Sequence, residues 1–174
     1  MNKTFYQKIY SKQADFYRRH KVALTALKAA NTLCTLLVVA GYIALCLITL
    51  LPSAQPTKYD YLRVLGAPAL CFVTASAARI FFDRKRPYER TEEEGGVSPL
   101  LHKKTKGHSF PSRHAASAFV IGTVAIAYMP PLGIGLLVVG IIIDYTRFST
   151  GVHFPTDLLA GSLWGAALGL LAFL

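Results

Sequence analysis

The sequence predicts an all-α fold, an integral membrane helical bundle with about five transmembrane helices after an amphipathic N-terminal interfacial helix. Hydrophobic residues make up 53% of the 174 residues, and charged residues only 16%. The hydrophobic residues gather in long apolar runs, which a soluble domain of this size rarely carries. Because an isolated helix satisfies its own backbone hydrogen bonds in lipid, such runs fold as membrane helices. The length allows one domain, residues 1–174.

The first expected element is a basic helix over residues 1–21, where lysines and arginines alternate with aromatic residues. The segment is too long and too polar for the start of a signal peptide, and no small-residue cleavage site follows the apolar run after it. Such a composition is typical of a helix that lies in the membrane interface, drawn to anionic headgroups. A plain basic tail is the alternative. The net charge of +10 points to lipid phosphate as the partner, and no nucleic-acid-binding module is recognisable.

Five apolar runs follow, and each is expected to cross the bilayer once. The first and last approach the ~20 residues that a span needs, and flanking polar residues extend the other three. Residues 52–61 form a short link, 83–109 a long charged connection and 129–131 a tight turn. The last run carries Gly161, Gly165 and Gly169 on one helix face, which predicts close helix packing. The runs are residues 33–51, 64–78, 115–129, 132–143 and 158–174.

Alternating direction through the membrane brings most of the polar residues near the spans to one face. The second span ends near Arg79, the third begins near His114, the fourth ends near Arg147 and the fifth begins near Asp157. Ionisable groups at membrane depth are costly and mark function by default. The residues expected at this face are Arg79, Arg86, Ser112, Arg113, His114, Thr146, Arg147, His153 and Asp157.

This set of side chains indicates a phosphate ligand. Arginines gathered at one place repel one another unless an anion lies among them, and the guanidinium fork matches phosphate oxygens. Ser112 can add a hydroxyl, and the start of the third span can add backbone N–H groups. No cysteine or histidine spacing suggests a metal site, and the three cysteines are expected to be packing residues. We therefore expect neither a metal nor a cofactor.

Two histidines indicate chemistry as well as binding, because a neutral imidazole can act as a nucleophile or transfer protons. In "HFPTD", residues 153–157, His153 precedes an expected helix start, with Pro155 near the first helical position. A carboxylate at Asp157 could orient the His153 ring. Alternatively, Asp157 only caps the helix.

The residues resemble the type 2 phosphatidic acid phosphatase (PAP2) superfamily over about residues 62–174. Its motifs Lys-x6-Arg-Pro, Pro-Ser-Gly-His and Ser-Arg-x5-His-x3-Asp correspond to "RIFFDRKRP" at 79–87, "PSRH" at 111–114 and "TRFSTGVHFPTD" at 146–157. Three motifs in order and with matching spacing make the resemblance specific. Arg79 stands in place of the usual lysine, Arg113 in place of glycine and Thr146 in place of serine.

The resemblance implies a role for each site residue. His153 would attack phosphorus, Asp157 would orient it, and His114 would protonate the leaving oxygen and then activate water. The phosphate oxygens would be held by Arg79, Arg86, Ser112, Arg113 and Arg147. The family needs no metal. The expected function is hydrolysis of a lipid phosphate or diphosphate, such as polyprenyl diphosphate, phosphatidylglycerophosphate or phosphatidic acid. A lipid phosphotransferase and a non-catalytic lipid-phosphate binder are the alternatives.

Two indications conflict over which side of the cell membrane carries the site. Seventeen of the 19 lysines and arginines fall on the motif face, and only Lys58 and Arg63 fall opposite. The positive-inside rule therefore favours the cytoplasm. The resemblance instead favours the outer side, where bacterial relatives usually act. The sequence leaves the side, the oligomeric state and the lipid tail open.

Overall fold

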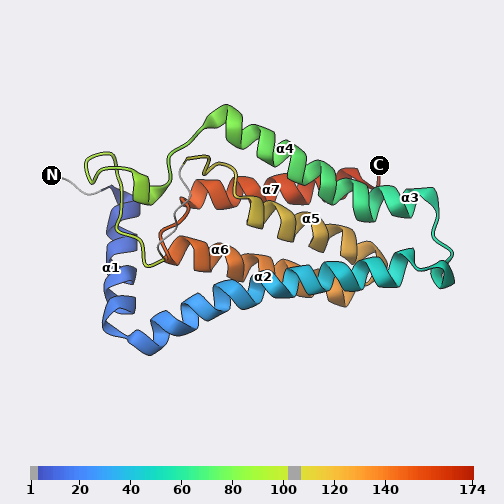
Figure 1. The fold of residues 1–174 in the computed structure, drawn as a ribbon, viewed down its shortest axis with the longest axis horizontal. Coiled ribbons are helices and arrows are strands. Elements are labelled where there is room, and N and C mark those ends of the chain that lie inside the picture. The colour runs from blue at the N-terminus through green and yellow to red at the C-terminus, as the bar shows by residue number, and fades with distance from the viewer. Residues whose placement is uncertain (1–3, 102–106) are drawn as a thin grey trace.

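The computed structural model describes residues 4–101 and 107–174, and within these residues every regular element is helical. In this part of the chain, five long helices run side by side and another crosses one end of them (Figure 1). The bundle helices are α2 (Lys21–Leu50), α4 (Ala67–Phe82), α5 (Arg113–Tyr128), α6 (Pro130–Ser149) and α7 (Pro155–Leu171). The crossing helix is α1 (Phe5–Arg19). The predicted helical bundle is confirmed.

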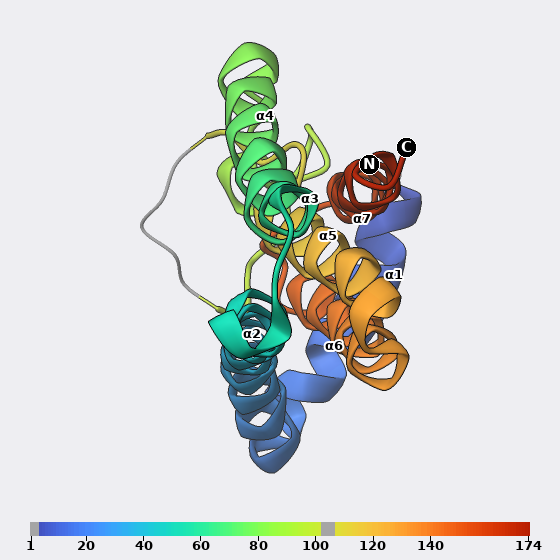
Figure 2. The same ribbon diagram turned by 90° about the vertical axis from the view of Figure 1, so that its right-hand side faces the viewer.

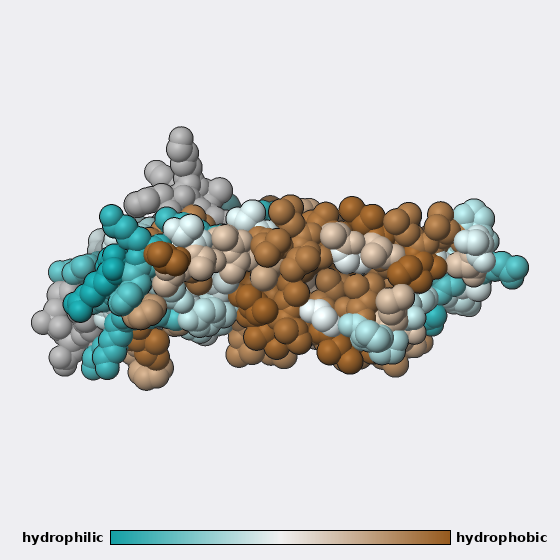
Figure 3. Space-filling view, turned by 90° about the horizontal axis from the view of Figure 1, so that it is seen from below, coloured by the Kyte–Doolittle hydropathy of each residue, from teal (hydrophilic) through white to brown (hydrophobic). Residues whose placement is uncertain are grey.

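The surface and the helix lengths suit a bilayer. Three helical stretches in the described residues are long and apolar enough to cross it, namely Lys21–Leu50, Lys58–Glu89 and Pro130–Ser149. The space-filling view shows a hydrophobic middle with hydrophilic residues toward both ends (Figure 3). The helices α5 and α7 have 16 and 17 residues. That these two also span the membrane remains a prediction.

The helix α5 lies among the other bundle helices and forms the packing centre (Figure 2). Its buried face is rich in alanine, including Ala115, Ala116 and Ala118. The glycine face of α7 packs against it so closely that a Cβ atom at Gly165 would lie 2.2 Å from the backbone oxygen of Ala116. The predicted packing role of the glycines is confirmed. This contact holds the first turn of α5 close to the middle of α7.

Several helix boundaries differ from the predicted apolar runs, because helices continue through flanking polar residues. The helix α2 begins at Lys21, twelve residues before the predicted apolar run, because the helix continues through polar residues next to α1. The second span begins with α3 (Lys58–Tyr61), inside the predicted link, since Asp60 accepts hydrogen bonds from the backbone and hydroxyl of Thr57. A π-helical turn, η2 (Leu62–Gly66), leads into α4, where Pro68 lacks a backbone donor.

The N-terminal helix α1 docks on the loops at the site end of the bundle. The side-chain amide of Gln7 donates to the backbone oxygens of Glu92 and Gly96 at 2.8 and 3.1 Å. The hydroxyl of Tyr10 donates to the backbone oxygen of Ser98 at 2.9 Å. One face of the predicted interfacial helix therefore packs on protein. Its contact with membrane lipid remains a prediction.

Candidate active site

The three sequence motifs meet at the end of the bundle that α1 crosses (Figure 1). This end collects the C-terminal ends of α4 and α6 and the N-terminal ends of α5 and α7. Arg79 lies in the last turn of α4, and Arg147 in the last turn of α6. His114 is the second residue of α5 and Asp157 the third residue of α7. The structure thus brings the motifs together as alternating direction predicted.

His153 and Asp157 form a buried pair at the start of α7. Their side chains are 2% and 0% exposed, and His153 Nδ1 lies 3.5 Å from Asp157 Oδ2. This distance is long for a hydrogen bond, and Nδ1 has no partner that meets hydrogen-bond geometry in the described chain. Catalytic hydrogen bonds are often long until substrate binds. The same oxygen accepts from the backbone N–H of Phe154 at 3.0 Å, so Asp157 also caps α7.

The surroundings of His153 keep its imidazole neutral. Burial lowers the pKa of His153 to about 4, and the charge of Arg86 acts in the same direction, while Asp157 opposes both. At neutral pH one ring nitrogen therefore carries a lone pair. With the proton on Nδ1, facing Asp157, that lone pair lies on Nε2. Arg86 Nη1 lies 3.4 Å from Nε2, so the lone pair faces the arginines.

Three buried arginines gather around this imidazole. Arg79, Arg86 and Arg147 are 7%, 7% and 3% exposed. Arg79 Nη1 donates to the backbone oxygen of Pro111 at 3.1 Å, whereas Arg147 Nε is buried with no hydrogen-bond partner among the described residues. The charges of Arg86 and Arg79 both repel that of Arg147. Such a cluster is favourable when an anion lies among the guanidinium groups.

The start of α5 supplies further predicted site residues. Ser112 is fully buried, and its backbone N–H donates to the backbone oxygen of Asp157 at 2.9 Å, which joins the second motif to the third. Its hydroxyl caps α5 by accepting from Ala115 at 3.5 Å. His114, the second residue of α5, is exposed.

Two motif residues, Arg113 and Thr146, make their contacts away from His153. Arg113 is exposed, and its guanidinium lies 5.4 Å from the centre of the Phe72 ring on α4. The Thr146 hydroxyl donates within α6 to the backbone oxygen of Ile143 at 2.9 Å. The described contacts therefore provide no link between either side chain and His153.

Sequence reasoning missed Arg84, which holds the other side of Asp157. Arg84 Nη1 donates to Asp157 Oδ1 at 2.7 Å and to the Thr156 hydroxyl at 2.8 Å. The guanidinium also lies 4.6 Å from the centre of the Phe154 ring. Arg84 lies between the fixed positions of the first motif. Its place in "DRKRP" therefore showed that a charged residue is present but did not identify the partner of that residue. The contact depends on the path of the loop across α7.

Glu89 was also missed, and it fixes the loop that carries Arg86. One carboxylate oxygen accepts from the backbone N–H of Arg86 at 2.8 Å, and the other accepts from Gly107 at 2.7 Å. The Arg86 side chain reinforces this link, because its Nε donates to the Gly107 backbone oxygen at 3.3 Å. In residues 4–101 and 107–174, no three His, Cys, Asp or Glu side chains are grouped so that they could hold a metal ion.

Comparisons with known proteins agree with this fold. Among solved structures, that of Aquifex aeolicus LpxE has a TM-score of 0.70 with 23% identity, covering 95% of this chain and 93% of that one. A transmembrane PAP2-type phosphatidylglycerolphosphate phosphatase from Bacillus subtilis has a TM-score of 0.66 with 21% identity, covering 96% and 82%. Both likenesses concern the fold.

Two curated relatives match part of the chain. A lipid A 4'-phosphatase of Bacteroides thetaiotaomicron is 29% identical over 60% of this chain and 54% of its own length. A bacitracin transport permease protein, BcrC, of Bacillus licheniformis is 35% identical over 67% of this chain and 57% of its own length. The chain thus spans little more than half the length of these relatives. The model of the PAP2 superfamily matches residues 60–174. The chain belongs to the PAP2 superfamily, and it is a membrane protein.

Proposed function

We propose that this protein is a multi-pass membrane lipid phosphatase, which hydrolyses a lipid phosphate or diphosphate through a phosphohistidine at His153. The observation that carries the proposal is the placement of His153. Its buried, neutral ring has Nε2 facing Arg86 and Nδ1 facing the Asp157 carboxylate. A nucleophile between an anion site and an orienting carboxylate is the arrangement that covalent catalysis requires.

In the first step, Arg79, Arg86 and Arg147 hold the phosphate oxygens and offset the charge that develops on them. The Nε2 lone pair of His153 attacks phosphorus, and the bond from phosphorus to the leaving oxygen breaks. His114 gives a proton to that oxygen. The phosphohistidine ring is now positively charged, and the Asp157 carboxylate stabilises this charge.

In the second step, water replaces the lipid. His114, now neutral, takes a proton from the water, whose oxygen attacks phosphorus. The bond from phosphorus to Nε2 breaks, orthophosphate leaves, and His153 regains its lone pair. Neither step uses a metal ion. Ser112 and Arg113 are assigned to phosphate binding on the resemblance, with Arg113 required to leave Phe72 for this.

The position of the site favours an amphiphilic substrate. The cluster lies at the end of the bundle that α1 crosses, and the middle of the bundle has a hydrophobic surface (Figure 3). A lipid tail can therefore stay in the bilayer while its phosphate enters the arginine cluster. The names of the relatives add lipid A phosphates to the candidates. Phosphatidylglycerophosphate, polyprenyl diphosphate and phosphatidic acid complete the panel.

The test is phosphate release in detergent from this panel by the wild type, His153→Ala and His20→Ala. His20 is exposed and lies between α1 and α2, so its variant is the matched control. We expect release by the wild type and the control, and none by His153→Ala with unchanged folding. A phosphorylated acceptor lipid without free phosphate would instead identify a phosphotransferase. Binding without release by the wild type would identify a lipid-phosphate binder.

A further inference from the structure

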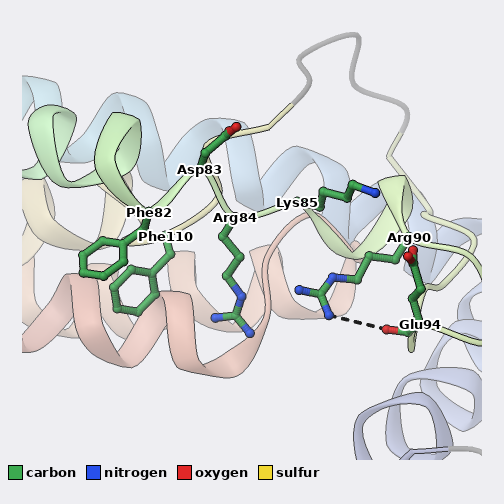
Figure 4. Close-up of a pocket in the computed structure, with 7 residues that line it drawn as sticks. All are labelled: Phe82, Asp83, Arg84, Lys85, Arg90, Glu94 and Phe110. Atoms are coloured by element: carbon green, nitrogen blue, oxygen red, sulfur yellow. Dashed lines mark hydrogen bonds between the residues drawn. The ribbon is translucent and has the colours of Figure 1, made fainter.

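A second group of cations lies on the other side of Asp157 from His153. It lines a cavity of about 810 Å³ formed by the end of α4, the loop that follows it and Phe110 (Figure 4). The volume is in the range of ligand pockets. The lining residues are Phe82, Asp83, Arg84, Lys85, Arg90, Glu94 and Phe110.

Two guanidinium groups converge in this cavity. The guanidinium carbons of Arg84 and Arg90 lie 4.6 and 5.0 Å from the centre of the same ring, that of Phe154. Figure 4 shows both side chains reaching into the space between their two backbone segments. Arg84 is partly neutralised by Asp157. Among the described residues, Arg90 donates a long hydrogen bond of 3.4 Å to the backbone oxygen of Glu94. Two guanidinium groups that pack against the same ring repel each other, and this arrangement favours an anion between them.

Each of the two carboxylates that line the cavity, Asp83 and Glu94, contacts a group other than the cavity's cations. Asp83 Oδ1 lies 3.1 Å from His108 Nδ1, and a carboxylate oxygen of Glu94 accepts from the backbone N–H of Thr91 at 3.1 Å. Among the described residues, neither carboxylate forms a salt bridge with Lys85 or Arg90.

The remaining lining residues of the cavity are apolar, and exposed apolar side chains precede them on α4. Phe82 and Phe110 pack edge to face with ring centres 5.3 Å apart. The neighbouring Ile80 and Phe81 are 70% and 83% exposed at the end of α4. Cations beside exposed apolar side chains at this level match a phosphate headgroup with its acyl chains in the bilayer.

We propose that this cavity binds the phosphate headgroup of an anionic membrane phospholipid, as a second site that is separate from the catalytic one. Asp157 is fully buried between the two cation groups, so one headgroup does not bridge them. Arg84 contacts both the cavity and Asp157, and it therefore links the bound lipid to the carboxylate behind His153. The proposal goes beyond hydrolysis and does not depend on it.

The single tryptophan gives a direct readout. Trp164 on α7 donates to the Thr74 hydroxyl on α4 at 3.0 Å, so it lies on the seam between the two helices. Trp164 is about 11 Å along α7 from Asp157, at 1.5 Å per residue. Phospholipid with bromine at mid-chain should therefore quench its fluorescence when the headgroup occupies the cavity.

The experiment compares brominated phosphatidylglycerol with brominated phosphatidylcholine in neutral detergent micelles. For the wild type we expect an apparent affinity about fivefold higher for phosphatidylglycerol, as expected for a few cations facing an anionic headgroup. The double variant Lys85→Gln, Arg90→Gln should lose this preference. The matched control, Lys8→Gln, Lys12→Gln, removes two exposed charges from α1 and should keep it. Circular dichroism and size-exclusion chromatography establish that the variants fold.

Equal quenching by the two lipids, or an undiminished preference in the cavity variant, would overturn the proposal. Loss of the preference in millimolar inorganic phosphate would assign the cavity to free phosphate and overturn the lipid assignment. If the double variant does not fold, Lys85→Gln and Arg90→Gln are measured singly, and each should lower the preference. Because the readout needs no turnover, its result is independent of whether His153 hydrolyses a lipid.

Discussion

Gly161 sets the distance between the second and third motifs, and Gly161→Ala should disturb the site. A Cβ atom there would lie 2.4 Å from the backbone oxygen of Ser112 and 2.9 Å from Ala115 Cβ. Real Cβ contacts essentially never fall below 3.0 Å, so α5 and α7 must separate locally by at least 0.6 Å. The obstacle is backbone, which cannot rotate away as a flexible side chain could.

The expected cost follows from that displacement. Overpacking of this kind destabilises by about 1–3 kcal/mol. A misplacement of about 1 Å can lower a rate a hundredfold, so 0.6 Å should lower kcat roughly tenfold. The shift separates Ser112 from Asp157, whose backbones share a hydrogen bond of 2.9 Å. Phosphate release and the thermal unfolding midpoint in detergent measure the two effects.

Gly135→Ala is the matched control, because a Cβ atom at Gly135 in α6 would have no neighbour within 4 Å. This variant should keep its activity and gain up to about 1 kcal/mol from helix propensity. If Gly161→Ala has the kcat and unfolding midpoint of the control, then close contact between α5 and α7 does not position the motifs, and the reasoning is refuted.

Three further variants or conditions test other contacts. Arg84→Gln should lower kcat roughly tenfold, since a hydrogen bond to a charged group contributes about 1.5–3 kcal/mol; unchanged kcat would exclude a positioning role toward Asp157. Acidification from pH 7 to 4 should lower the unfolding midpoint. The pKa of His153 is about 4 in the folded protein and 6.5 in the unfolded chain. The unfolded chain therefore takes up the proton first, and the free energy of unfolding falls by up to about 3 kcal/mol between pH 7 and pH 4. In His153→Asn the unfolding midpoint should depend less steeply on pH. Gln7→Ala leaves two carbonyls without their donor and should destabilise by about 1–3 kcal/mol, with faster proteolysis of α1; an unchanged proteolysis rate would show that α1 is held by other contacts.

Much of the fold could be predicted because a bilayer simplifies it. Apolar runs become helices, and alternating direction decides which ends meet, so Arg79, Arg147 and Asp157 were expected at one face before any contact was known. The start of α7 was also predictable, because Pro155 suits the first helical position. The structure places these helix ends together, and the chemical roles of the residues remain predictions.

The rest depended on contacts that follow no sequence period. Arg84 reaches Asp157 only because the loop after α4 passes over the start of α7. Arg113 was expected among the phosphate ligands, but its position as the first residue of α5 directs it onto Phe72. The docking of α1 on the loop near Gly96 rests on hydrogen bonds to backbone oxygens, which no side-chain pattern reveals.

The central claim is that phosphate passes through His153, and trapping the intermediate tests it most directly. The wild type is mixed with its best lipid phosphate, quenched in alkali within one turnover, digested and analysed by peptide mass spectrometry. The account predicts a phosphate on His153 that survives alkali, is lost in acid and disappears as turnover completes. Turnover with no phosphorylated peptide, or with the phosphate on another residue, would contradict it.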